Sequence, residues 1–152
     1  MEGVAASLEA LALAEWLRYS RWGYAAVNAI HIFGISLLVG ALVPMNLRLL
    51  GLWSSIELGP LYWMLSRVAG VGLVVAVASG LLLFAVRATE YVAINLFAVK
   101  LALIAFGVAH AAFLHFGTRP TKLSRSRQRI AGALALLLWP TVLVCGRLLA
   151  FV

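Results

Sequence analysis

The chain has 152 residues, of which 64% are hydrophobic and 11% charged, and its net charge is +7. Soluble domains are about 45–50% apolar and about 25% charged, so this composition excludes a soluble globular fold and predicts a single domain embedded in a lipid bilayer. The basic residues lie between apolar segments, where they set membrane topology, and this placement excludes nucleic acid as an expected partner.

The N-terminal segment, at about residues 5–21, predicts a short amphipathic helix lying in the membrane interface. Leu8, Leu11, Glu15 and Arg18 recur there at helical spacing, which gives the helix one apolar and one polar face. Aromatic residues typical of an interfacial belt cluster beside it: Trp16, Tyr19, Trp22 and Tyr24. No basic region precedes an apolar core, so we expect no cleaved signal peptide.

Four apolar segments follow, each close to the roughly 20 residues that cross a hydrocarbon core about 30 Å thick. We expect transmembrane helices at about 22–43, 66–87, 91–116 and 130–151. Backbone polar groups in lipid must bond within their own segment, so each span is expected to be helical. Pro44 is expected to end the first helix. The expected fold is therefore an all-α bundle of four transmembrane helices.

The distribution of Lys and Arg predicts the orientation of the bundle. Loops 44–67 and 117–129 hold the larger set of basic residues: Arg48, Arg67, Arg119, Lys122, Arg125, Arg127 and Arg129. The opposite side mixes Arg18, Arg21 and Arg87 with acidic residues. By the positive-inside rule the two loops are cytoplasmic, and both termini lie outside a bacterial cytoplasmic (inner) membrane.

Small residues recur along the first two spans: Gly34, Ser36, Gly40, Gly70, Gly72, Ala76, Ser79 and Gly80. Such residues let helices approach closely, and they also leave room for a flat cofactor. Close packing is the favoured interpretation, with a cofactor site as the alternative.

Polar side chains at membrane depth are costly, so they indicate functional sites. His31 lies in the first span about 13 Å deep, with Asn28 one turn earlier. A neutral histidine there can bind haem iron or another metal through a ring nitrogen. The alternative is an imidazole that is hydrogen-bonded across the bundle.

The third span carries two further histidines, His110 and His115. Five residues turn a helix by about 140°, so the two side chains do not share a face. His110 is the deeper of the two and is the favoured second ligand. His115 lies near the cytoplasmic end, where it is either a ligand or an interfacial residue.

Lys100 and Arg147 are expected at the depth of His31, in the outer half of the bundle. Two cations there, without an acid at the same depth, favour an anionic cofactor group such as a haem propionate. The alternative is that both long side chains snorkel to the outer interface.

The sequence lacks the motifs of several other chemistries. The single Cys145 rules out an intrachain disulfide and a CxxC metal site. The sequence contains no GxGxxG, P-loop, HExxH or GxSxG motif. Methionines are scattered along the chain, whereas copper conduction favours clusters of Met or Cys ligands, so the sequence does not favour a copper channel.

The stretch His31-Ile-Phe-Gly-Ile-Ser-Leu-Leu-Val-Gly40, followed by Leu47–Gly51, resembles a group of small, uncharacterised four-helix bacterial membrane proteins. The stretch Asn95–Leu103 resembles the third helix of the same group. This resemblance extends over nearly the whole chain and implies a four-helix membrane fold.

More distantly, the first and third spans are similar to two better-known families. One is the copper resistance D membrane domain, and the other is the four-helix, haem-associated bacterial protoporphyrinogen oxidase. The resemblance to the oxidase implies that His31 matches its first-helix histidine and Lys100 its third-helix lysine. His110 matches its later histidine only approximately. The chain lacks a counterpart of the oxidase's first-loop tryptophan and arginine pattern.

Together these features predict a membrane-embedded protein that binds haem b. His31 and His110 are the predicted iron ligands, and Lys100 and Arg147 are expected near the propionates. The expected role is electron transfer, as an oxidoreductase component or as the membrane anchor of a redox partner. Besides the lipid bilayer, the expected partner is a redox protein or a second copy of the chain. The alternatives are a small-solute or metal-ion (copper) transport protein and a non-catalytic structural or assembly subunit.

Overall fold

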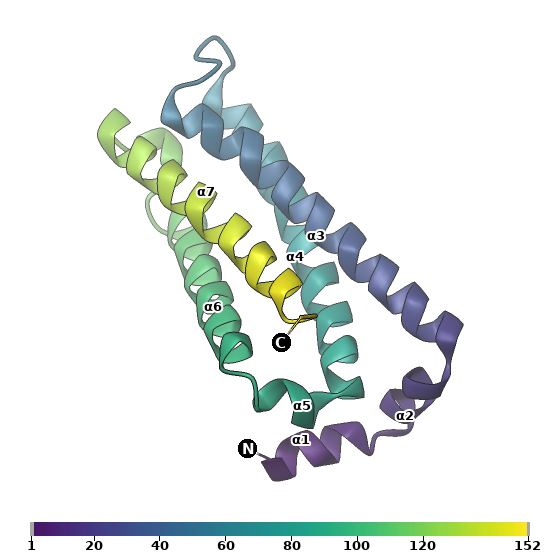
Figure 1. Cartoon of the computed structure of the whole chain (residues 1–152). Helices are drawn as coiled ribbons and strands as arrows, with labels where there is room; N and C mark the ends of the chain where they lie inside the picture. Colours follow the sequence, from purple (N-terminus) through teal and green to yellow (C-terminus); the bar gives the residue numbers. More distant parts are fainter. Residues whose placement is uncertain (1, 152) are drawn as a thin grey trace.

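A computed structural model describes residues 2–151, and every regular element in that range is helical. Figure 1 shows the elements in chain order: α1 (Glu2–Glu9), α2 (Ala12–Tyr19), α3 (Arg21–Leu50), α4 (Leu58–Val86), α5 (Ala88–Val92), α6 (Asn95–Phe116), the 3-10 turn η1 (Pro120–Lys122) and α7 (Arg125–Leu148). Of these, α3, α4, α6 and α7 are long and apolar enough to cross a membrane. The predicted all-α architecture with four such helices is therefore confirmed.

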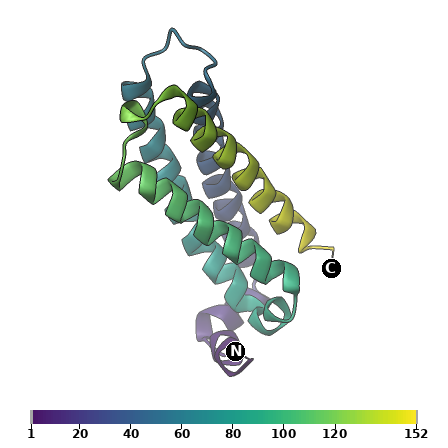
Figure 2. The same ribbon diagram turned by 90° about the vertical axis from the view of Figure 1, so that its left-hand side faces the viewer.

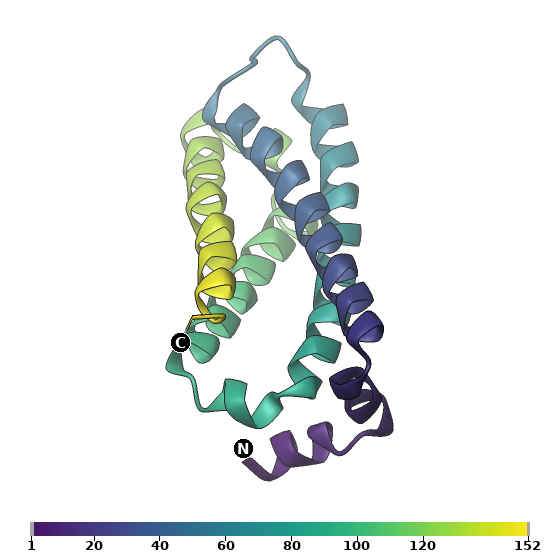
Figure 3. The same cartoon turned by 45° about the vertical axis from the view of Figure 1, so that its right-hand side comes forward.

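The four long helices form one bundle with two different ends. α3 packs along both α4 and α7, and α7 packs along α6. The α3–α4 and α6–α7 connections lie together at one end, which we call the loop end (Figure 2). The helices α1, α2 and α5 lie at the opposite end, the terminal end, towards which α7 also runs (Figure 1). At the terminal end α5 bridges α4 and α6 (Figure 3).

The buried core lies between α3, α4 and α7. It consists of these side chains: Leu38, Ala41, Leu42, Met45, Ala69, Ala135 and Trp139. No residue of α6 belongs to this cluster, because α6 packs mainly on α7 and is the least buried of the four long helices. The bundle is therefore a tight three-helix unit with α6 attached to one side.

The closest helix contact joins α3 and α4 through Gly34 and Gly72. A Cβ atom on Gly34 would lie 2.6 Å from the backbone nitrogen of Ala76, and one on Gly72 would lie 2.5 Å from that of Leu38. No real side chain fits at such distances, so both positions require glycine at this crossing. The interpretation of the small residues as packing positions holds here, whereas Gly40 and Gly70 face open space.

The end of the first long helix differs from the prediction at Pro44. α3 continues through Pro44 to Leu50, because a proline inside a long apolar helix is tolerated when neighbouring helices hold the segment. The helix ends where Gly51 adopts a left-handed conformation with φ of 111°, the usual glycine signal for a helix end. The predicted loop 44–67 is therefore much shorter and spans residues 51–57.

The second long helix begins earlier than predicted, at Leu58 rather than about residue 66. Pro60 lies in its first turn, where amide groups have no partner within the helix and proline is accommodated. The helix ends at Val86, close to the predicted end.

The last two long helices also differ from their predicted bounds. α6 begins at Asn95, because Ile94 is extended and separates it from the short helix α5, in which Tyr91 lies. α7 begins at Arg125 and ends at Leu148. Both of its ends therefore come several residues earlier in the chain than those of the predicted span 130–151. Hydropathy misses the first turns of α7 because they are basic, although arginine is a good helix former. The predicted loop 117–129 shortens accordingly.

The N-terminal segment forms two helices instead of one at 5–21. Leu11 is extended, which breaks the helix between α1 and α2. The break lets α1 pack on α5 while α2 packs against α3 and α4. Trp16 and Trp22 remain exposed, at 57% and 81%, as expected for an interfacial face.

Two polar residues dock this N-terminal pair onto the α4–α5 corner. The carboxylate of Glu9 accepts hydrogen bonds from the backbone N–H and the hydroxyl of Thr89, at 2.8 and 2.7 Å. The guanidinium of Arg18 donates to the carbonyl of Val86, at 2.9 Å from Nη2, and lies 3.7 Å from Glu9. Glu9 thus accepts a hydrogen bond from an amide at the start of α5, and Arg18 donates one to a carbonyl at the end of α4. We call this group the corner clamp.

The helix crossing gives a first prediction. Gly72→Ala should lower the free energy of unfolding by about 1–3 kcal/mol, because α3 and α4 must separate to admit the methyl group. Gly70→Ala, two residues away on the same helix, meets open space and should leave stability unchanged or slightly higher. Unfolding in detergent, followed by circular dichroism, measures both. Equal losses in the two variants would contradict the assigned contact.

The corner clamp gives a second prediction, on pH. The pKa of the Glu9 carboxyl is lowered, first by the backbone N–H of Thr89, then by the Thr89 hydroxyl and by Arg18. A folded-state pKa below the usual value of about 4.3 means that the clamp stabilises docking fully at neutral pH. That contribution disappears as the pH falls through the usual value and then the lowered one.

Amide hydrogen exchange of residues 2–19, corrected for the intrinsic effect of pH, measures this release. Exchange should rise below about pH 4 in the wild type, and it should already be high at pH 7 in Glu9→Gln. A Glu9→Gln variant with wild-type protection at neutral pH would show that the clamp does not hold the segment.

Candidate functional site

His31 lies on α3, one turn before the Gly34 crossing, and its ring faces α4. Its Nδ1 atom lies 2.8 Å from the backbone carbonyl oxygen of Ala76 and 3.2 Å from Oγ of Ser79. The side chain is half-buried. The contact follows from the crossing, because Gly34 and Gly72 bring the helices close enough for the histidine to reach the α4 backbone.

The contact with Ala76 determines which ring nitrogen of His31 carries the proton. A backbone carbonyl can only accept a hydrogen bond, so Nδ1 must be protonated and donate to it. The Ser79 hydroxyl donates its own proton to the carbonyl of Val75, at 2.5 Å, which leaves its oxygen as a further acceptor. In the neutral ring, Nε2 therefore keeps its lone pair, and it makes no hydrogen bond within residues 2–151.

Gly80 gives the His31 ring its space on α4. A Cβ atom on Gly80 would lie 3.0 Å from Cε1 of His31 and 3.9 Å from Nε2. The first distance is tighter than ordinary contact, so any side chain here would push against the ring. The ring is thus positioned on α4 by the hydrogen bond at Nδ1 and by the neighbouring glycine, whose Cβ position lies 3.4 Å from the same Nδ1 atom.

Lys100 lies on α6, and its side chain is half-buried. The end of the lysine lies against α7, where Nζ is 3.5 Å from the position of a Cβ on Gly146. No carboxylate forms an ion pair with Lys100 in the described part of the chain. Lys100 is therefore a half-buried cation without a carboxylate partner in the described residues, and its predicted place beside His31 stays a prediction.

His110 does not join this pair. It lies ten residues after Lys100 on α6, which is about 15 Å along the helix axis. Its side chain is half-buried and makes no hydrogen bond to any described residue. Two axial nitrogens on one iron lie only about 4 Å apart, at roughly 2.0 Å each from the metal. Ligation of one iron by His31 and His110 stays a prediction that this helix arrangement does not support.

The other predicted site residues lie elsewhere. Arg147 is exposed, and its guanidinium lies over the ring of Phe151, 4.8 Å from the centroid. His115 is exposed at the loop end of α6, with its ring edge-on to Phe116. Asn28 is also exposed. Snorkelling of Arg147 and an interfacial position for His115 stay predictions.

Sequence reasoning missed the backbone of α4 as the partner of His31. The Ala76 carbonyl has no sequence signal of its own, because every residue has a carbonyl group. Ser79 and Gly80 were visible only as members of a row of small residues. A small polar residue followed by glycine, opposite a histidine at the same expected depth, is the signal that identifies such a partner.

Metal clusters of the usual protein type are not found among the described residues. No group of three or more His, Cys, Asp or Glu side chains that could hold an ion occurs within residues 2–151. Haem iron needs only one or two protein ligands, so this finding bears on zinc- or copper-type sites and not on a haem.

Comparison with protein-family models, with curated proteins and with solved structures finds no match to this chain. The resemblances inferred from the His31 and Lys100 segments therefore stay predictions, and the site rests on its own geometry.

The assigned ring form of His31 gives a third prediction. Nitrogen-15 NMR of the histidine-labelled protein in detergent, near neutral pH, should show one histidine with a protonated Nδ1 and an unprotonated Nε2. The His31→Ala variant identifies that signal by its loss. Detection of His31 with its proton on Nε2 would contradict the hydrogen bond to Ala76, because a ring of that form cannot donate from Nδ1.

Proposed function

We propose that the chain is a multi-pass membrane protein with its loop end in the cytoplasm and its termini outside. The four long apolar helices support this proposal. Two basic residues at the terminal end are paired with carboxylates, Arg18 with Glu9 and Arg87 with Glu90. The segment of residues 117–129 is basic and holds no acidic residue. The positive-inside rule then directs the loop end inward, in a bacterial cytoplasmic membrane.

We further propose that this protein binds haem b and that His31 is the axial ligand of the iron. The observation that carries the proposal is the hydrogen bond from Nδ1 of His31 to the carbonyl of Ala76. Histidines that ligate metals almost always donate their other ring N–H in this way, which orients the ring and raises its basicity. The free Nε2 atom is the nitrogen that the iron requires.

Lys100 supports the same assignment through its charge. A cation in an apolar bundle is costly without a counter-ion, and this one has no carboxylate partner in the described residues. A haem propionate supplies a carboxylate, and an ion pair with it would satisfy the ammonium group. The single cofactor thus accounts for two polar groups, Nε2 of His31 and the ammonium group of Lys100, that have no partner in the described residues.

The proposal assigns one histidine, not two, to the iron. His110 is about 15 Å further along α6 than Lys100 and is not near the His31 ring in this arrangement. The other axial position is left to a small molecule or to a residue of another chain. Haem supplies one-electron chemistry when bound, while the helices set its ligation, burial and access. The role that follows is electron transfer, or anchoring of a redox partner at the membrane.

The absorption spectrum of the purified full chain, supplied with haem and recorded before and after dithionite, tests this proposal. We expect a Soret band that shifts on reduction. The band should be lost in His31→Ala and restored to that variant by added imidazole, which replaces the missing ligand. Lys100→Met should bind haem about tenfold more weakly, the effect of losing one charged hydrogen bond.

His110→Ala and His115→Ala are the matched controls, because both remove a histidine from α6 and should keep the band. A protein that takes up no haem would refute the proposal. Metal analysis would then separate a metal-transport protein from a structural subunit.

A further inference from the structure

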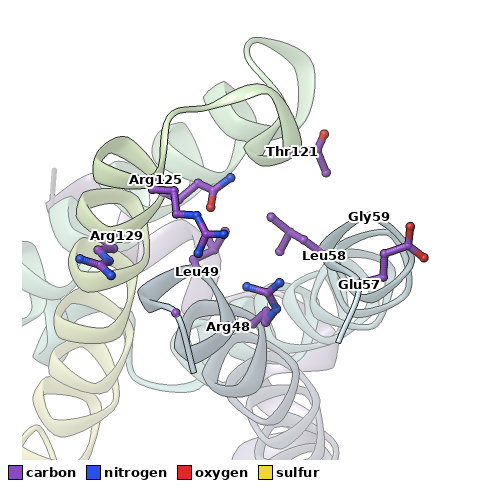
Figure 4. Close-up of a pocket in the computed structure, with 10 residues that line it drawn as sticks. Arg48, Leu49, Glu57, Leu58, Gly59, Thr121, Arg125 and Arg129 are labelled. Carbon is purple, nitrogen blue, oxygen red and sulfur yellow. The ribbon is translucent and has the colours of Figure 1, made fainter. Parts of the chain in front are cut away.

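The loop end contains a pocket of about 330 Å³ that is walled by three arginines. Arg48 comes from the end of α3, and Arg125 and Arg129 come from the start of α7. Figure 4 shows the side chains of Arg48 and Arg125 projecting into the space between α3, α4 and α7. Segments far apart in the sequence therefore build one basic site, distant from His31.

The charges in this pocket are not neutralised by the chain. Glu57 also lines the pocket, but no carboxylate lies within 4.0 Å of Arg48, Arg125 or Arg129 in the described residues. Neither Arg125 nor Arg129 donates a hydrogen bond to any described residue. Like charges gathered in this way repel each other, and an anion bound between them removes that repulsion.

The walls of the pocket are held in place by polar contacts. Arg48 donates from Nε to the carbonyl of Ile56 at 2.8 Å, which uses part of its guanidinium and ties down the α3–α4 loop. Gln128 donates to the carbonyl of Pro120 at 2.9 Å and so fixes the η1 turn against α7. These contacts within the chain hold the walls of the pocket in place without a ligand.

The start of α7 also favours the binding of an anion in this pocket. Ser124, which precedes the helix, makes no capping hydrogen bond with its side chain. The first amide groups of a long helix carry partial positive charge and donate readily to anions. Leu49 and Leu58 complete the wall on its apolar side, so the pocket joins a basic rim to an apolar edge.

We propose that this arginine pocket binds a phosphate group. Guanidinium groups match phosphate oxygens in pairs, which distinguishes a phosphate from a simple monovalent ion. Two sources carry that group at a cytoplasmic membrane face, an anionic phospholipid headgroup and a soluble phosphate. The proposal does not depend on haem binding, because it uses none of the same residues.

Native mass spectrometry of the full chain in detergent tests the lipid source, with phosphatidylglycerol compared against the zwitterionic phosphatidylcholine. Calorimetric titration with inorganic pyrophosphate, in phosphatidylcholine nanodiscs, tests the soluble source. If phosphatidylglycerol or pyrophosphate binds, Arg125→Gln and Arg129→Gln should each lower the affinity for that ligand by about tenfold. Arg125→Lys keeps the positive charge but loses the two parallel N–H donors of the guanidinium group. Its affinity for the same ligand should therefore fall below that of the wild type.

Arg127→Gln is the matched control, because Arg127 lies on the same helix turn and is exposed like Arg125 and Arg129, but does not line the pocket. It removes the same charge and should leave binding near the wild-type value. Binding of phosphatidylglycerol or of pyrophosphate that depends on Arg125 and Arg129 supports the proposal and identifies the source. Binding of neither ligand, or equal losses in all three glutamine variants, would overturn it.

Discussion

The close approach of α3 and α4 at Gly34 and Gly72 is the contact on which the rest of the structure depends. Helices in an apolar solvent gain little from burying further apolar surface, so close packing of small residues holds them together. Here a methyl group at either glycine would meet the backbone of the opposite helix. The same approach brings His31 within 2.8 Å of the Ala76 carbonyl. One packing contact thus both joins the helices and determines which nitrogen of the half-buried His31 ring carries the proton.

The bundle is organised unevenly around that contact. α3, α4 and α7 share the core, while α6 is held mainly by α7 and at its start by the short helix α5. The corner clamp of Glu9 and Arg18 fastens the N-terminal helices to the same region. Lys100 is therefore carried on the least buried long helix, whereas His31 lies on α3 in the closely packed α3–α4 pair. This arrangement leaves its ammonium group without a carboxylate in the described chain.

Hydropathy was sufficient to predict the four long helices, but their ends depend on features it does not measure. The first helix passes Pro44 and stops at Gly51, because backbone geometry and neighbouring helices, not apolarity, decide the end. Depth counting along the spans predicts Lys100 and Arg147 at the depth of His31. Gly146, next to Arg147, lies against Lys100. Because one residue turns a helix by about 100°, Arg147 itself lies on an exposed face of α7. The Ala76 carbonyl could not be predicted, since a backbone acceptor leaves no mark in a sequence.

We propose that one histidine, His31, presents a free Nε2 atom to a haem iron. The electron paramagnetic resonance spectrum of the ferric, haem-loaded protein tests this proposal, because spin state reports the number of strong axial ligands. We expect a high-spin ferric signal that disappears in His31→Ala and persists in His110→Ala. A low-spin signal that requires both His31 and His110 would contradict it, as would a chain that binds no haem.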